Sequence, residues 1–161
     1  MAIEIERKFL VKGDYKSMAT SHSLYRQGYL SSNPDCSIRI RIAGEKGFIT
    51  IKGKSNDKGM SRYEWEKEIT VAEADELIQF CISGIIEKVR YLVPFDGFIF
   101  EVDEFHGNNE GLTVAEIELK SEEEEFTYPP WLGKEVTGIK RYYNSSLLNA
   151  PFSQWPIELK Y

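Results

Sequence analysis

The sequence contains little cysteine, no long apolar run and no excess of basic residues. Its two cysteines, Cys36 and Cys81, are too few for a disulfide framework and too far apart for a zinc-binding motif. No stretch approaches the roughly 20 apolar residues that span a bilayer. The chain begins with acidic residues, where a secretory signal would have basic and then apolar ones. We therefore expect a cytoplasmic protein with no membrane partner.

The charge balance argues against nucleic acid as a partner. Twenty basic and 26 acidic side chains give a net charge of −6, whereas proteins that coat nucleic acid are basic. The chain has 161 residues, of which 42% are hydrophobic, and no repeat, low-complexity tract or flexible linker interrupts it. These properties predict a single globular domain over residues 1–161.

Alternation of polar and apolar residues is the dominant pattern along the chain, and it predicts β-strands with one apolar face. Turn-forming residues separate the strands, and links this short join antiparallel neighbours. Helices are expected only at 71–80, with Thr70 as the N-cap, and at 141–149, while the acidic run 122–125 is expected to be an exposed turn or loop. The predicted strands are 2–11, 24–30, 36–43, 47–54, 61–70, 85–93, 97–106 and 112–120.

The polar face of the strands is almost entirely ionisable, and most strands carry charges of one sign. A sheet with its polar side in water is the simple explanation for one such strand. Like charges two residues apart on a strand lie about 7 Å from each other and repel, so pairs that recur on successive strands invite counterions. The ionisable residues that share a face on each strand are Glu4, Glu6 and Lys8; Arg39 and Arg41; Lys52 and Lys54; Arg62, Glu64, Glu66 and Glu68; Lys88 and Arg90; Glu101 and Asp103; Glu116 and Glu118.

A closed barrel places such faces around one enclosed space. About eight antiparallel strands can close with the ionisable face inside and the apolar face outside, covered by the few helices, and a barrel of that size holds one small ligand. Bare charges inside would be prohibitively costly, so they must be paired or filled by ligand and metal. A phosphate chain with Mg²⁺ or Mn²⁺ satisfies both signs of charge. The predicted fold class is thus α+β, mainly antiparallel β, with a closed eight-stranded barrel.

The sequence resembles the CYTH superfamily of triphosphate tunnel metalloenzymes, and is most similar to the short bacterial inorganic tripolyphosphatases. The first strand carries the family's E-x-E-x-K motif as Glu4-Ile5-Glu6-Arg7-Lys8. Further motifs follow in order over nearly the whole chain: Tyr25–Leu30, Arg39/Arg41, Thr50–Lys54, Arg62–Glu66, Glu87–Tyr91, Glu101–Asp103, Ala115–Leu119 and Trp131–Thr137. The resemblance implies an eight-stranded tunnel that binds a triphosphate and divalent cations. It also implies a hydrolase that converts tripolyphosphate to pyrophosphate and phosphate.

The resemblance also implies roles for particular side chains. The residues expected to bind substrate phosphates are Arg39, Arg41, Lys52, Lys88 and Arg90, with Arg62 as a further candidate. Those expected to bind one or two ions of Mg²⁺ or Mn²⁺ are Glu4, Glu6, Glu116 and Glu118, assisted by Asp103. Glu64, Glu66 and Glu101 are expected to support these groups. Lys8 and Tyr29 are expected to form a catalytic donor pair that faces the terminal phosphate and the attacking water.

Other functions within and outside this family stay open. A class IV-type adenylate cyclase would use the same tunnel on ATP, and a thiamine or nucleoside triphosphatase would hydrolyse an organic triphosphate. A non-catalytic polyphosphate-binding module would have no use for the carboxylates. The expected partner is a small polyphosphate or a nucleoside triphosphate, and a homodimer is left open.

Overall fold

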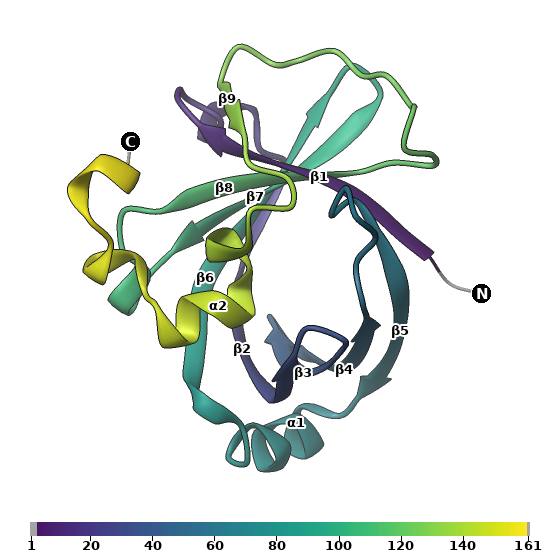
Figure 1. Cartoon of the computed structure of the whole chain (residues 1–161), viewed down its shortest axis with the longest axis vertical. Helices are drawn as coiled ribbons and strands as arrows, with labels where there is room; N and C mark the ends of the chain where they lie inside the picture. Colours follow the sequence, from purple (N-terminus) through teal and green to yellow (C-terminus); the bar gives the residue numbers. More distant parts are fainter. Residues whose placement is uncertain (1–2, 161) are drawn as a thin grey trace.

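The computed structural model describes residues 3–160, which form a closed antiparallel β-barrel with two helices (Figure 1). All the predicted strands are present; residue 2 of the first one lies outside the described residues. The barrel strands are β1 (Ile3–Val11), β2 (Ser21–Asn33), β3 (Cys36–Ala43), β4 (Lys46–Gly53), β5 (Ser61–Ile69), β6 (Ile82–Phe95), β7 (Phe98–Phe105) and β8 (Thr113–Glu118).

The barrel closes because β1 pairs with strands on both of its edges. The order around the barrel is β5-β4-β3-β2-β6-β7-β8-β1, and β1 pairs with β5 as well as with β8. In this register Glu4 faces Arg62 on β5, and Lys8 faces Glu116 on β8. Closure removes the free edges that an open sheet would expose.

The longest strands extend beyond the predicted ranges. β2 and β6 pair over most of their length, from the partners Ser21 and Leu92 to the partners Tyr29 and Ile82. Their ends lack alternating apolar residues, so backbone pairing with the neighbouring strand, rather than a local pattern, makes them β-structure. The short strand β9 (Leu132–Glu135), which pairs with β1, was not predicted for the same reason.

The apolar side of the barrel faces outward and is covered in three places. The segments before β2 and after β8 cover one cluster, which includes Phe9, Phe100 and Trp131. The C-terminal segment covers a second cluster through Leu147, Phe152 and Trp155, and helix α1 covers the third at β3. The principal hydrophobic cores therefore lie outside the barrel, and its interior is left to polar side chains.

Two helices occur near the predicted positions. Helix α1 (Val71–Ile78) begins after Thr70, whose hydroxyl accepts a hydrogen bond from the Glu73 backbone N–H, while Glu73 reciprocates at the Thr70 backbone N–H. This capping box confirms the predicted N-cap. In place of one helix over 141–149, a 3₁₀ turn at Lys140–Tyr142 precedes helix α2 (Asn144–Asn149). The acidic run 122–125 lies in a turn and loop, as predicted. Within residues 3–160, neither helix has the length and apolar character required to cross a membrane.

We predict that Thr70→Ala lowers the free energy of unfolding by about 1 kcal/mol, because the first turn of α1 loses its cap. Urea denaturation measures the change. Thr70→Ser is the matched control, since it keeps the accepting hydroxyl and should stay close to the wild type. Equal destabilisation by the two substitutions would show that the cap does not stabilise α1.

Candidate active site

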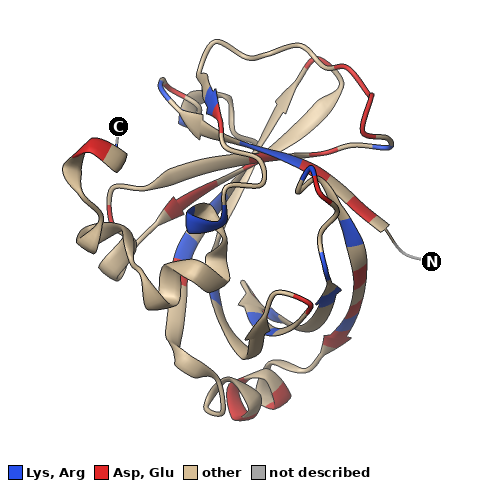
Figure 2. Cartoon of the chain, in the orientation of Figure 1, with Lys and Arg blue, Asp and Glu red and all other residues tan. Residues whose placement is uncertain are grey.

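The interior of the barrel contains a cavity of about 250 Å³. Every residue predicted for the functional site lines this cavity except Asp103, which lies behind it. Both signs of charge are carried on the strands that surround it (Figure 2). The prediction that the ionisable face points inward is therefore confirmed.

The two signs of charge occupy different halves of the barrel. The strands β4, β3 and β6, with β2 between β3 and β6, supply mostly basic lining side chains: Lys52, Arg39, Arg41, Lys88 and Arg90. Most of the acidic ones come from β7, β8, β1 and β5: Glu101, Glu116, Glu118, Glu4, Glu6, Glu64 and Glu66. Lys8 on β1 and Arg62 on β5 add positive charge to this acidic half. A linear polyanion and a cation would each find complementary charge here.

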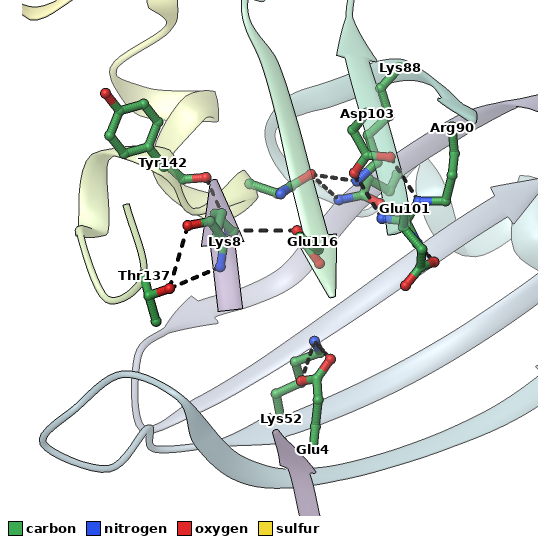
Figure 3. A network of polar contacts seen from close by, with 12 residues as sticks. Glu4, Lys8, Lys52, Lys88, Arg90, Glu101, Asp103, Glu116, Thr137 and Tyr142 are labelled. Atoms are coloured by element: carbon green, nitrogen blue, oxygen red, sulfur yellow. Dashed lines mark hydrogen bonds and ion pairs between the residues drawn. The ribbon is translucent and has the colours of Figure 1, made fainter. Parts of the chain in front are cut away.

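Asp103 on β7 is the centre of a buried ion-pair network. The Arg90 guanidinium donates from Nε to Oδ1 over 2.7 Å and from Nη2 to Oδ2 over 2.8 Å. The Lys88 ammonium donates to Oδ2 over 2.8 Å, and Arg90 also donates from Nη1 to Glu101 over 2.6 Å (Figure 3). Lys88 and Asp103 are each 1% exposed. These contacts direct the Asp103 carboxylate toward the bases Lys88 and Arg90. Its expected role in assisting a metal ion therefore stays a prediction.

Among the residues described, Arg41 is the one base of the basic half that no carboxylate contacts. Burial lowers the pKa of Arg41 to about 10, and the positive charges of its neighbours Arg39 and Arg90 add to the effect. Burial likewise lowers the pKa of Lys88 to about 7 against the opposing effect of Asp103. The buried Nε of Arg39 has no hydrogen-bond partner among the residues described. A buried N–H donor without an acceptor in the basic half of the cavity is suited to bind a phosphate oxygen.

Lys52 joins the two halves of the barrel through carboxylates. Its ammonium lies 2.9 Å from Glu4 (Figure 3). It also lies 3.1 Å from Glu64. Arg62 lies 3.6 Å from the same Glu4 carboxylate. Burial raises the pKa of Glu4, but Lys52 and Arg62 outweigh that effect and lower it to about 2. Glu4 is therefore ionised throughout the physiological pH range.

The remaining acidic side chains repel one another. Burial, with Glu116 and Glu4 nearby, raises the pKa of Glu6 well above its usual value. Burial also raises the pKa of Glu118, and Glu4 and Glu101 add to the effect. Burial would raise the pKa of Glu116 too, but Lys8 and Arg90 hold it well below its usual value. Glu6 and Glu118 are direct partners in the β1–β8 pair, where like charges are unfavourable.

Lys8 and Tyr29, the predicted catalytic pair, both line the cavity but have separate contacts. The Lys8 ammonium donates to the Tyr142 carbonyl over 3.4 Å and lies 3.7 Å from Glu116 (Figure 3). The aromatic ring beside it is that of Tyr143, with its centroid 5.3 Å from Nζ. Tyr29 is buried on β2, and among residues 3–160 no hydrogen bond joins it to Lys8. The pairing therefore stays a prediction.

One wall of the cavity was missed by the sequence analysis. It is formed by the segment after β9, through Thr137, Gly138, Tyr143, Asn144 and Ser145. Gly138 packs against Gly59 of the β4–β5 loop, where a Cβ on Gly59 would lie 2.5 Å from the Gly138 Cα. Both glycines have positive φ. The run RYYNSS has no strand pattern, and the sequence predicted only a short helix there. Its contribution to the site depends on tertiary packing.

Comparison with known proteins agrees with this geometry. Residues 2–147 match the sequence profile of the CYTH domain. The chain belongs to the CYTH family. A curated relative from Acetivibrio thermocellus, named inorganic triphosphatase, is 50% identical over 157 residues, covering 96% of this chain and 99% of that protein. Another with the same name, from Nitrosomonas europaea, is 38% identical over 148 residues, covering 89% and 95%.

A solved structure extends the comparison to the fold of this CYTH protein. The crystal structure of an inorganic triphosphatase superposes with a TM-score of 0.65 at 36% sequence identity, covering 89% of this chain and 96% of that one. Membership of the CYTH family of tunnel metalloenzymes implies that the protein uses a divalent cation.

The acidic half of the cavity in this CYTH protein fits a divalent cation. Glu4, Glu6, Glu116 and Glu118 supply carboxylate oxygens, the ligands that hard cations such as Mg²⁺ prefer. A cation between them would offset the repulsion that raises the pKa of Glu6 and Glu118. Within residues 3–160, no three carboxylates are already gathered at ligand spacing. The donor set is thus chemically suitable, and its side chains would have to converge on the ion.

We predict that Arg90→Lys lowers the free energy of unfolding by about 1–3 kcal/mol, because a lysine cannot form the two-pronged contact with buried Asp103. Urea denaturation measures the loss. Arg26→Lys is the matched control, since the side chains of Arg26 and Glu87 are 39% and 55% exposed and their charged atoms lie 3.9 Å apart. This control should change stability by less than about 0.5 kcal/mol. Similar losses in the two variants would contradict the importance of the Asp103 network.

Proposed function

We propose that this CYTH protein is an inorganic triphosphatase that hydrolyses the terminal phosphoanhydride of tripolyphosphate, releasing pyrophosphate and phosphate. The observation that carries the proposal is the enclosed cavity with a basic half and an acidic half. The two curated relatives named inorganic triphosphatase support the choice of reaction, since each aligns over nearly the whole chain.

The basic residues bind the phosphate chain in this proposal. Arg39, Arg41, Lys52, Lys88 and Arg90 donate to phosphate oxygens, with Arg62 as a further donor. Buried donors are already aimed before substrate arrives, so little reorganisation is needed as charge develops on the leaving pyrophosphate. Glu64, Glu66 and Glu101 orient these bases. Glu64 lies 3.1 Å from Lys52, Glu66 3.6 Å from Arg39 and Glu101 2.6 Å from Arg90.

The acidic residues hold the cation in this proposal. Glu4, Glu6, Glu116 and Glu118 are the ligands for one or two ions of Mg²⁺ or Mn²⁺, and Asp103 assists by anchoring the bases beside them. When bound, such an ion neutralises phosphate charge and lowers the pKa of a coordinated water. A bound ion would favour the ionised form of Glu6, whose pKa is raised by burial and by the nearby carboxylates.

The reaction needs no covalent intermediate. Among the residues described, neither histidine nor cysteine lines the cavity. We assign to Lys8 and Tyr29 the positioning of the terminal phosphate and the attacking water. Lys8 is held for this by the Tyr142 carbonyl and by Glu116, and Tyr29 faces the cavity from β2.

Phosphate release from tripolyphosphate, ATP and thiamine triphosphate tests the function, each with Mg²⁺, Mn²⁺ or EDTA. We expect metal-dependent release from tripolyphosphate at the highest kcat/KM, equimolar pyrophosphate, and loss of turnover in EDTA. Glu116→Ala should lose the metal-dependent turnover, while the surface control Arg26→Ala should retain it. Formation of cyclic AMP from ATP would indicate a cyclase instead. A preference for thiamine triphosphate would indicate a thiamine triphosphatase. Binding without turnover would indicate a polyphosphate-binding module.

A further inference from the structure

Asn144, the first residue of α2, contacts two buried residues in the basic half of the barrel. Its Oδ1 accepts a hydrogen bond from Gln27 Nε2 over 2.9 Å and another from Lys88 Nζ, also over 2.9 Å. Gln27 is fully buried and Lys88 is 1% exposed. One carbonyl oxygen from the C-terminal segment thus uses both of its lone pairs on strands β2 and β6.

The chemistry of the neighbours dictates which way both amides point. Lys88 donates to Asn144 Oδ1, and in its ammonium form it can only donate, so Asn144 presents its oxygen to Lys88. A guanidinium also only donates, and Arg41 Nε lies 3.1 Å from Gln27 Oε1, so Gln27 must present its NH₂ group to Asn144. The contacts therefore form one directed chain from Arg41 through Gln27 to Asn144, which Lys88 joins from the other side.

These contacts determine the direction of the remaining Lys88 N–H. An ammonium has three tetrahedral donors, and two are used by Asp103 Oδ2 at 2.8 Å and Asn144 Oδ1 at 2.9 Å. Two directions set the third, and within residues 3–160 no third oxygen or nitrogen acceptor contacts this ammonium, although the centroid of the Phe105 ring lies 5.6 Å from Nζ. Because Lys88 lines the cavity, its third N–H is available to a ligand there. With Asp103 alone, the ammonium could rotate about that single contact.

We propose that Asn144 is a positioning residue for the triphosphatase reaction, whose side-chain oxygen aims the Lys88 ammonium, and through Gln27 the Arg41 guanidinium, at the substrate phosphates. The inference rests on the proposed function, because it assigns Asn144 to the same site. No contact of Asn144 with substrate is required. The placement of Asn144 depends in turn on the C-terminal segment, which is held by the Lys8–Tyr142 hydrogen bond and by the Gly59–Gly138 contact.

The first test compares Asn144→Ala and Asn144→Asp with Asn149→Ala, a control at the exposed end of the same helix. Asn144→Ala should reduce kcat/KM for tripolyphosphate about tenfold to hundredfold, the range that corresponds to loss of a hydrogen bond to a charged group. Asn144→Asp keeps both accepting positions, so kcat should stay within about threefold while the added negative charge raises KM. Asn149→Ala should behave as the wild type. Equal activity of Asn144→Ala and the wild type would overturn the proposal.

A double-mutant cycle separates positioning from a structural role. Lys88→Met removes the ammonium that Asn144 orients, and tripolyphosphate affinity is measured by titration calorimetry in EDTA for both single variants and the double variant. If Asn144 acts through Lys88, Asn144→Ala should weaken binding several-fold less in the Lys88→Met background than in the wild type, because only the contact through Gln27 to Arg41 then remains. Equal weakening in both backgrounds would assign Asn144 a structural role and overturn the proposal. Failure of the wild type to bind or hydrolyse tripolyphosphate would instead refute the proposed function.

Discussion

Burial of opposite charges inside one closed barrel is the constraint on which the rest of the structure depends. Lys88 and Asp103 are almost fully buried, and a single buried charge without a partner would cost several kcal/mol. The barrel tolerates them because each is paired: Asp103 receives two contacts from Arg90 and one from Lys88. The apolar residues are consequently displaced to the outside, where loops, α1 and the C-terminal segment cover them.

Pairing alone leaves the charges unevenly distributed, and this imbalance makes the cavity a binding site. The strand order places the basic strands β4, β3 and β6 in one half of the barrel, with β2 between β3 and β6. In the acidic half, Glu6 and Glu118 are partners across the β1–β8 pair. Burial is the main cause of the lowered pKa of Arg41 and the raised pKa of Glu6, and the like charges beside each group add to it. In the proposed function a phosphate chain would contact the bases and a divalent cation the carboxylates, so each ligand would improve the site for the other.

Local sequence patterns predicted the barrel because alternation is itself local. Glu4, Glu6 and Lys8 share a face whichever strands flank them, and the cavity contains all three. The expected helix at 71–80 was recognisable from Thr70 and Glu73, which are three residues apart. Conversely, nothing local marked β9 or the wall formed by Thr137 to Ser145, since their structure depends on packing against β1 and the β4–β5 loop. Asn144 meets Lys88 and Gln27 across 56 and 117 residues of chain, so its place in the site had no signal in the neighbouring sequence.

The coupling between anion and cation tests the central claim most directly. Pyrophosphate, the proposed product, can be titrated into the protein by calorimetry with and without Mg²⁺, for the wild type and for Glu116→Ala. The account predicts that Mg²⁺ tightens pyrophosphate binding by about tenfold or more in the wild type, and that Glu116→Ala loses most of this gain while still binding pyrophosphate in the absence of Mg²⁺. Equal pyrophosphate affinity with and without Mg²⁺ in the wild type, or an undiminished gain in Glu116→Ala, would contradict it.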